Sequence, residues 1–486
     1  MRATPRHTKS AGHWILSVQL AILARAPFNN PSGGFVNHRA VRTTEIRSRG
    51  AAARALAAGV LAFPMTLPAQ GGGSALAREV DRRAPQLEAK AVAWRRDIHQ
   101  HPELSNREVR TSKLVADHLR SLGIEVKTGV AKTGVVGILR GGRPGPVVAL
   151  RADMDALPVA EEVDVPFKST VRSQYNGQDV GVMHACGHDA HVAILMSVAE
   201  LLAGMKEQLP GTVKFIFQPA EEGAPPGEEG GAALMIKEGV LENPKVDAVF
   251  GLHVFPYEVG SMHYRPGPIM ASSDRFEIVV HGRQTHGALP WNGVDPVVTA
   301  SQIVLGLQTI TSRQIDLIES PAVITVGRLN AGVRYNIVPD SAVLEGTIRT
   351  FSEAMRATIH ERIKRTAESI ATSAGATATA RVFPYTPVTA NDPALTERMA
   401  STLKRVAGAD KVAIAKQTTT AEDFALYEQK VPGLFFFLGI TPKGTDPSKA
   451  APNHSPRFFV DEGALVPGIR ALANLAIDYL ATGRTQ

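Results

Sequence analysis

The chain has 486 residues, enough for two or three domains and at least one large core. Its net charge of +7 is concentrated at the start, where residues 1–72 hold nine Lys or Arg and one acidic residue. The remainder is close to neutral, so the charge gives no reason to expect a nucleic-acid-binding protein. The single cysteine, Cys186, excludes an intrachain disulfide.

Residues 1–72 form an N-terminal extension that we interpret as an export signal. Within it, residues 47–70 place arginines before an apolar run of about a dozen residues and then small residues, the order of a secretory signal. The apolar run is too short to span a membrane. A second apolar run at 14–24 is a rival signal core. We expect a secreted or periplasmic protein, or a cytoplasmic one if this segment is not a working signal.

Residues 76–267 alternate predicted helices and strands, the pattern of a layered α/β domain. One amphipathic helix is predicted from 77 to near Pro102, a second over 107–123 and a third over 189–205. Apolar, β-branched runs at 135–141, 145–158 and 211–223 predict strands. This alternation indicates an α/β fold with a mostly parallel sheet, in which chemistry collects at the carboxyl ends of the strands.

Residues 268–384 have a different pattern. Strands are predicted over 275–282, 322–330, 342–350 and 378–385, and helices over 297–313 and 353–375. This β-α-β-β-α-β order predicts a ferredoxin-like α+β domain. Residues 385–486 return to the helix and strand pattern of the first part, so we predict one α/β domain interrupted by a smaller inserted domain.

The stretch MHACGHDAH, residues 183–191, carries the only cysteine among three histidines. Thiolate and imidazole groups are ligands of zinc and related metals. Cys186 and His188 lie on one turn at the start of a predicted helix, whose N-terminus favours the thiolate. From this stretch alone, a metal site and a thiol nucleophile both stay open.

Three further groups follow apolar runs and add candidates. Glu221 and Glu222 follow a strand, where one carboxylate can bind a metal while its neighbour acts as a general base. His253 lies within an apolar strand and His454 lies in a loop between two prolines. Each histidine alone is as well explained by packing or by surface exposure, but side chains at the ends of strands in one sheet can converge.

Together these motifs give the chain a family resemblance. GVMHACGHDAHVA, LRADMDALP, FQPAEEG, GLHV, AEDFA and NHSPRF occur in the order found in the M20 metallopeptidase family. From about residue 85 to 480 the chain resembles the amidohydrolase branch of that family, which includes hippurate hydrolases, N-acyl-amino-acid amidohydrolases and auxin-conjugate hydrolases. The fold implied is a zinc-peptidase-like catalytic domain with a ferredoxin-like domain that serves as lid and dimerisation surface.

The resemblance implies a site for two divalent metal ions, which would be manganese, zinc or cobalt. Its metal ligands would be Cys186, which would bridge the ions, His188, Glu222, His253 and His454. Glu221 would be the general base for the attacking water. Asp155 would orient a metal ligand without binding the metal itself. For Asp153 we assign no role, and a simple turn residue is the alternative.

In the inserted domain, His286 matches a lid histidine that helps to hold the oxyanion, often in the active site of the partner subunit. Asn336 and Arg349 match positions associated with substrate contact; for Arg349, a solvated strand position is the competing interpretation. The resemblance also implies a homodimer that acts on a small-molecule substrate, with no nucleic-acid partner and no membrane contact beyond export.

The function expected is metal-dependent hydrolysis of the amide bond of N-acyl amino acids. One alternative is a carboxypeptidase or dipeptidase of the same fold. Another is a relative that binds acyl amino acids or peptides without catalysis, although the presence of Glu221 and all five candidate ligands argues against it. A thiol hydrolase that uses Cys186 and His188 would keep its activity after chelation.

Overall fold

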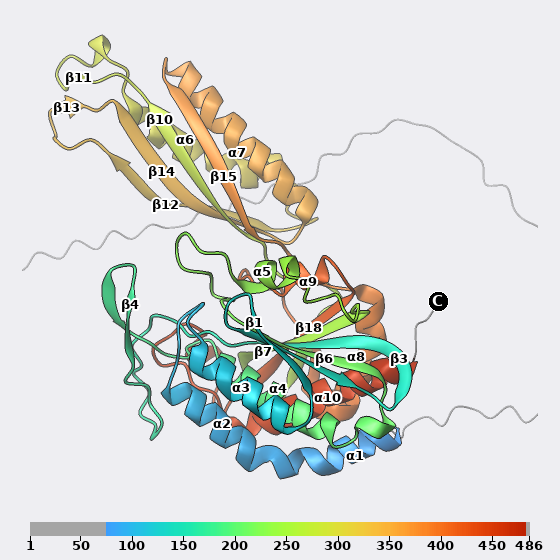
Figure 1. Cartoon of the computed structure of the whole chain (residues 1–486). Coiled ribbons are helices and arrows are strands. Elements are labelled where there is room, and N and C mark those ends of the chain that lie inside the picture. Colours follow the sequence, from blue (N-terminus) through green and yellow to red (C-terminus); the bar gives the residue numbers. More distant parts are fainter. Residues whose placement is uncertain (1–73, 483–486) are drawn as a thin grey trace, which may run out of the picture. The chain divides into compact units, whose positions relative to one another are not determined.

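A computed structural model describes residues 74–482, and the predicted signal segment lies outside this range. Its largest sheet has eight strands in the order β1-β2-β6-β3-β7-β18-β8-β17. Figure 1 labels β1, β6, β3, β7 and β18 of this sheet. The strands are β1 (Glu125–Val130), β2 (Gly134–Arg140), β3 (Arg143–Asp153), β6 (Pro210–Gln218), β7 (Ala248–Glu258), β8 (Met262–Tyr264), β17 (Val412–Ile414) and β18 (Gly433–Thr441). The central strands β6, β3, β7 and β18 are mutually parallel, as predicted, so their carboxyl ends share one edge.

Helices cover both faces of this sheet. They are α1 (Ala75–Arg83), α2 (Glu88–Gln100), α3 (Val109–Ser121), α4 (His188–Ala203), α5 (Gly231–Lys237), α8 (Pro393–Ala407), α9 (Ala425–Glu428) and α10 (Leu465–Thr482). The main core lies between the sheet and α4 and α10, and a second core packs the other face against α5 and α9. Because α4 is almost wholly buried, the residues at its N-terminus are held firmly against the sheet.

The prediction of one helix from 77 to near Pro102 is wrong in detail. The chain forms α1 and α2 with a 3₁₀ turn, Ala84–Leu87, between them. Pro85 lacks a backbone N–H and its ring crowds the preceding turn, which breaks a continuous helix. The strands predicted over 145–158 and 211–223 also end early, at Asp153 and Gln218, and the chemically important residues follow in turns.

Within residues 74–482, the segment Glu462–Thr482 is long and apolar enough to cross a membrane, but 72% of its apolar window is buried inside the protein. This burial fits a core helix, because α10 packs against α4 and β3.

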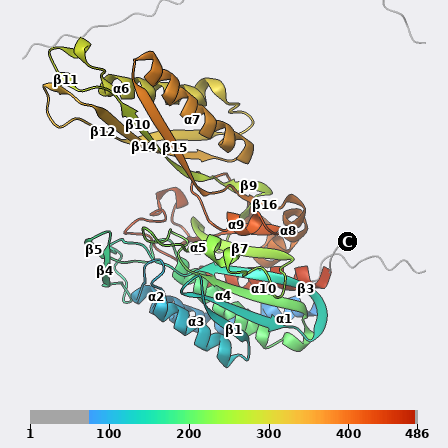
Figure 2. The ribbon, with the colours of Figure 1, turned by 45° about the horizontal axis from the view of Figure 1, so that its top comes forward.

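The smaller sheet has four antiparallel strands in the order β12-β14-β10-β15. They are β10 (Ser273–His281), β12 (Ala322–Ala331), β14 (Ser341–Thr350) and β15 (Thr377–Thr386). Helices α6 (Pro296–Thr309) and α7 (Glu353–Ser373) cover one face of this sheet (Figures 1 and 2). The element order is the predicted β-α-β-β-α-β order, while the predicted domain boundaries at 268 and 384 stay predictions.

The helix-covered face of the small sheet is apolar. Phe276, Ile278, Leu344 and Ile348 alternate along β10 and β14 and are buried against α6 and α7. Side chains of the alternate residues therefore lie on the other face, which we call the open face.

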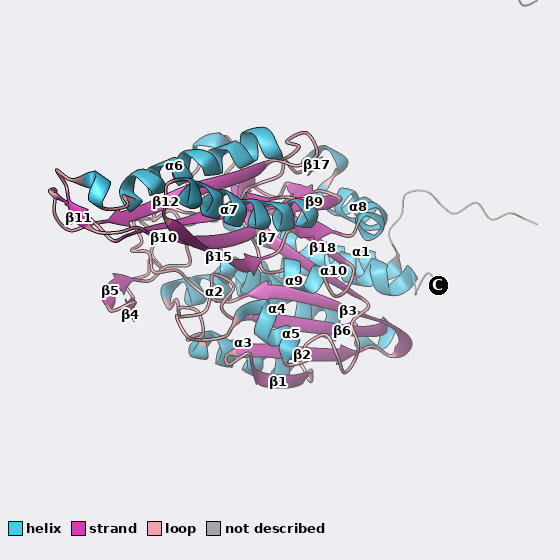
Figure 3. Cartoon of the chain, turned by 90° about the horizontal axis from the view of Figure 1, so that it is seen from above, coloured by secondary structure: helices cyan, strands magenta, loops and turns pink. Residues whose placement is uncertain are grey.

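The remaining strands form three short pairs. They are β4 (Arg172–Tyr175) with β5 (Gln178–Gly181), β9 (Gly267–Met270) with β16 (Thr389–Asn391), and β11 (Thr285–His286) with β13 (Ile337–Val338). Figure 3 shows the strands and helices coloured separately, with β1, β2, β6 and β3 side by side in the large sheet.

Candidate metal centre

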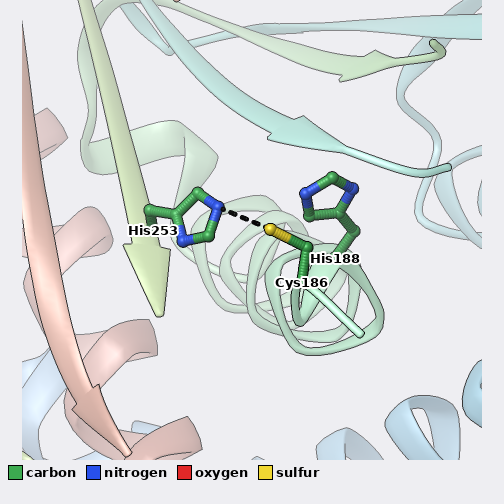
Figure 4. Close-up of side chains that lie close together, drawn as sticks. All are labelled: Cys186, His188 and His253. Atoms are coloured by element: carbon green, nitrogen blue, oxygen red, sulfur yellow. Dashed lines mark hydrogen bonds between the residues drawn. The ribbon is translucent and has the colours of Figure 1, made fainter. Parts of the chain in front are cut away.

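The turn that carries Cys186 depends on a glycine. Gly187 has a φ of 93°, a region that residues with a side chain rarely adopt, and it is the N-cap of α4. A Cβ at this position would lie 2.2 Å from Cγ2 of Val254. The tight turn lets Cys186, which precedes it, and His188, which opens α4, lie beside His253 (Figure 4).

Cys186, His188 and His253 form the first candidate ligand group, with all three ligand atoms within 4.8 Å of one another. The Cys186 Sγ lies 3.4 Å from Nε2 of His253. In both histidines Nδ1 lies 2.8 Å from a backbone carbonyl oxygen, that of Asp155 for His188 and that of Val254 for His253. Donation from Nδ1 leaves both Nε2 atoms free to bind a metal, an arrangement common in metal sites.

Cys186 also belongs to a second candidate group, with Glu222 and His454. The Nε2 of His454 lies 3.1 Å from Oε1 of Glu222. His454 has a φ of 70°, unusual for a residue with a side chain, and its backbone N–H donates to the carbonyl of Ala185 at 2.7 Å. The two groups share only Cys186, so its sulfur lies within reach of the ligand atoms of both.

The turn after β6 gives the two predicted glutamates, Glu221 and Glu222, different neighbours. The carboxylate of Asp155 accepts the backbone N–H groups of Glu221 at 3.1 Å and Glu222 at 3.0 Å. Glu222 faces His454, whereas Glu221 Oε1 lies 3.4 Å from the backbone N–H of Asp423 and Oε2 lies 4.0 Å from Nε2 of His188. Both carboxylates lie 4.0 Å from Nε2 of His188 and form a candidate group with it, but only Glu222 also shares a group with Cys186 and His454.

The electrostatics of the site call for positive charge. Burial acts to lower the pKa of His188, but Asp153 and Asp155 raise it to about 10. Burial and the neighbouring carboxylates, Glu422 and Glu222 first among them, raise the pKa of Glu221 well above its ordinary value. Without a bound cation, protons held by His188 and Glu221 offset the negative charge of the neighbouring carboxylates. Divalent ions would supply the missing charge.

The helix N-terminus favours the thiolate form of Cys186, but burial and nearby carboxylates oppose it while no cation is bound. Burial, then Glu222 and Glu221, raise the pKa of the Cys186 thiol well above its ordinary value. Desolvation and negative neighbours outweigh the helix dipole here. A buried thiol of this kind is a poor nucleophile but becomes a thiolate when it binds a metal.

Two other candidate groups contain carboxylates that already pair with protein side chains. One is Asp153, His188 and His191, and the other is Glu221, Glu422 and Asp423. His191 uses both ring nitrogens, because Nδ1 lies 2.6 Å from Asp153 and Nε2 accepts the backbone N–H of Val254. Asp153 also pairs with the buried Arg151, as does Glu422 at 2.8 Å. Arg151 thus neutralises carboxylates that lie behind the ligand groups.

Sequence reasoning missed several supporting residues. Asn453 donates to the carbonyl of Cys186 at 3.1 Å and to that of Val254 at 3.3 Å, and so ties the loop of His454 to the site. Glu108 accepts the backbone N–H of Ala220 at 2.9 Å. The motifs held no signal for these contacts, since each joins segments more than 100 residues apart.

Of the three residues predicted in the inserted domain, only Arg349 lies at the site. Arg349 lines the same cavity as Cys186, Glu222, His253 and His454. His286 and Asn336 do not line it; both lie at the short β11–β13 pair, where His286 is exposed and Asn336 is half-buried. The nine-residue strand β10 leads from the cavity-lining Ser273 toward β11. It spans about 27 Å at the usual rise of about 3.3 Å per residue. His286 is therefore remote from Cys186 of its own chain.

The sequence pattern described as Peptidase family M20/M25/M40 matches residues 149–478. The chain belongs to this family. Thermostable carboxypeptidase 2 of Saccharolobus solfataricus is 43% identical, over 83% of this chain and 99% of that protein. N-acetylcysteine deacetylase of Bacillus subtilis is 41% identical, over 81% of this chain and 97% of that protein.

Among solved structures, the YxeP protein of Bacillus subtilis, described as a dinuclear metal-binding peptidase, has 38% identity and a TM-score of 0.69. The match covers 82% of this chain and 99% of that one. The protein is thus a metal-dependent amidohydrolase or peptidase. The residues present fit two divalent ions. Two ligand groups share Cys186, and the Nε2 of His188 is buried without a hydrogen-bond partner among residues 74–482.

Replacing Asp155 with alanine is expected to lower metal affinity by roughly ten- to a hundredfold, because the carboxylate holds the Glu221–Glu222 turn in place. Metal content after dialysis against graded chelator measures this effect. Asp179→Ala, which removes an exposed carboxylate on β5 that pairs with Arg172, is the matched control. Equal metal retention in both variants would contradict this role of Asp155.

Proposed function

We propose that this enzyme hydrolyses the amide bond of N-acyl amino acids that keep a free carboxylate. The observation that carries the proposal is the sharing of Cys186 by two ligand groups, with Glu221 beside them, on the wall of a cavity of about 380 Å³. Export, which rests on the signal pattern of residues 47–70, is part of the same proposal.

Glu221 is the general base in this proposal. It accepts a proton from the attacking water and returns it to the leaving amine. Cys186, His188, Glu222, His253 and His454 would hold the metal ions. When bound, two such ions activate water and polarise the amide carbonyl, and manganese, zinc and cobalt all suit this ligand set.

The lining of the cavity supports an acyl amino acid as the substrate. Phe255, Met270 and Phe437 give it an apolar wall near His253. Arg349 lines the cavity and makes no ion pair with any residue in 74–482. Its Nη1 donates to Thr347 and to the carbonyl of Ile348, which leaves Nε and Nη2 to donate to a substrate carboxylate. An apolar acyl group on one side and a carboxylate on the other match this lining.

The relatives support amide hydrolysis but differ in substrate. The names of the two most useful relatives describe a deacetylase of N-acetylcysteine and a carboxypeptidase. A carboxypeptidase also acts on an amide bond next to a free carboxylate, so it is the second candidate function. The two differ only in whether an acyl group or a peptide lies on the other side of the bond.

A homodimer belongs to the same proposal, with His286 reaching the site of the partner subunit. The Nδ1 of His286 accepts the backbone N–H of Ala288 at 3.0 Å, which leaves an Nε2–H to donate toward an oxyanion. Val298 and Leu305 on α6 are 55% and 71% exposed. Apolar side chains so exposed on one helix favour contact with a second copy of the chain.

The proposal is tested with protein that begins near Gln70 and a panel of hippurate, N-acetylmethionine, an indole-acetyl amino acid and a dipeptide. We expect turnover of at least one acyl amino acid, its loss on exhaustive chelation, and its return with manganese, zinc or cobalt. Cys186→Ala is expected to fail to regain activity because both ligand groups lose a member.

Preferred turnover of the dipeptide would move the assignment to the carboxypeptidase alternative. Activity that survives chelation but is lost on thiol alkylation would overturn the metal-dependent mechanism. A folded, metal-loaded protein that turns over none of the four compounds would contradict the proposed function.

A further inference from the structure

Beyond Arg349, the small sheet places hydroxyl groups of Ser273, Tyr385 and Thr386 at the cavity without an assigned role, and we consider the first two. Ser273 begins β10, and Tyr385 lies near the end of β15; both line the cavity that holds the ligand groups. Neither hydroxyl forms a hydrogen bond with any other residue of the described range. Both hydroxyls are therefore free to donate to a molecule bound in the cavity.

Strand register places these donors in one row. Asp274 pairs with Ile348, so Ser273 lies opposite Arg349, and Ser273 itself pairs with Thr386 on the other neighbouring strand. Ser273 and Arg349 also lie on the open face, as the alternation with the buried Asp274 and Ile348 requires. The hydroxyl of Ser273 on β10 thus lies next to the guanidinium of Arg349 on β14.

A β-bulge adds Tyr385 to this row. The register shifts between Ser273, which pairs with Thr386, and Asp274, which pairs with Pro384, so Tyr385 is the extra residue. Bulges commonly redirect a side chain next to an active site. The Tyr385 hydroxyl oxygen would lie only 2.6 Å from a Cβ on Gly223, so it reaches the turn directly after Glu222.

The bulge is held in place by a buried ion-pair cluster. The backbone N–H of Tyr385 donates to Asp274 Oδ1 at 3.2 Å. Arg356 donates to both oxygens of Asp274, at 2.6 and 2.9 Å, and His360 lies 2.7 Å from Oδ2. The position of the Tyr385 backbone is therefore fixed before any substrate binds.

We infer that Ser273 and Tyr385 complete, with Arg349, a subsite for the free carboxylate of the substrate. Two hydroxyl donors and one guanidinium suit the acceptor oxygens of a carboxylate. Neutral carboxamides would lose the charge-assisted bonds. The subsite lies within one subunit, and it makes both hydroxyls determinants of specificity. This inference rests on the proposed function.

The test compares N-acetylmethionine with its primary amide, N-acetylmethioninamide, as substrates of the metal-loaded full enzyme. We expect the wild-type enzyme to prefer the acid by roughly a hundredfold in kcat/KM. Tyr385→Phe and Ser273→Ala should each lose roughly tenfold with the acid, mainly through KM, and little with the amide. Arg275→Met is the matched control, because Arg275 also lies on the open face but pairs with Glu345 outside the cavity.

Calorimetric titration of both compounds into the metal-loaded Glu221→Gln protein separates this inference from the proposed function. A preference for the acid that shrinks in both hydroxyl variants supports the subsite even if the wild-type enzyme turns over neither compound. Equal affinity for acid and amide, or a preference unchanged by both substitutions, would overturn the inference while leaving amide hydrolysis intact.

Discussion

Replacing Glu221 with glutamine is expected to lower kcat/KM on the best acyl amino acid by at least roughly a thousandfold, because general acid–base catalysis contributes about 10²–10⁴. Glutamine keeps the shape of the side chain but cannot accept the proton of the attacking water. The backbone contacts of the turn run through Asp155 and do not involve the Glu221 carboxylate. The fold and the ligand groups should therefore survive.

Metal content and kinetics of the same preparation test this prediction together. We expect both ions to remain bound, since Glu222 and not Glu221 shares a ligand group with Cys186 and His454. Glu229→Gln is the matched control, because Glu229 lies in the same loop but pairs with Lys237 on the surface. Activity of Glu221→Gln within tenfold of the wild type would remove Glu221 from the mechanism. Loss of the metals would instead make it a ligand.

The sequence predicted best what is local. Cys186 and His188 are two residues apart, and a glycine between them that tolerates a φ of 93° is enough to bring them onto one turn. Glu221 and Glu222 follow a strand whose carboxyl end lies at the predicted edge of the sheet. Hydrophobic periodicity and turn residues also predicted the element order of the small sheet and the central strands of the large one, but not its strands β1, β8 and β17.

What the sequence could not predict is long-range pairing. The alignment of His253 with Phe437, and hence its place beside Cys186, depends on strand register in the finished sheet. Asn453 supports Cys186 across 267 residues of chain. The raised pKa of the Cys186 thiol could not be predicted for a related reason, because it comes from burial and from carboxylates of distant segments.

Mixed dimers offer the sharpest test of the role proposed for His286. His286→Ala and Glu221→Gln should each be nearly inactive as homodimers, the first for want of the oxyanion donor and the second for want of the base. In a mixed dimer, the subunit with an intact Glu221 would receive an intact His286 from its partner. Random assembly of equal amounts should restore about a quarter of wild-type activity.

Coexpression of the two variants with different affinity tags allows the mixed dimer to be purified and assayed alone. Its activity per dimer should approach half that of the wild type, since one of its two sites has both groups. The prediction follows from geometry: His286 lies beyond the far end of β10, whereas Ser273 at the near end lines the cavity. A mixed dimer as inactive as its parents would show that His286 does not act across the interface. A monomeric wild-type protein with full activity would remove the need for a partner altogether.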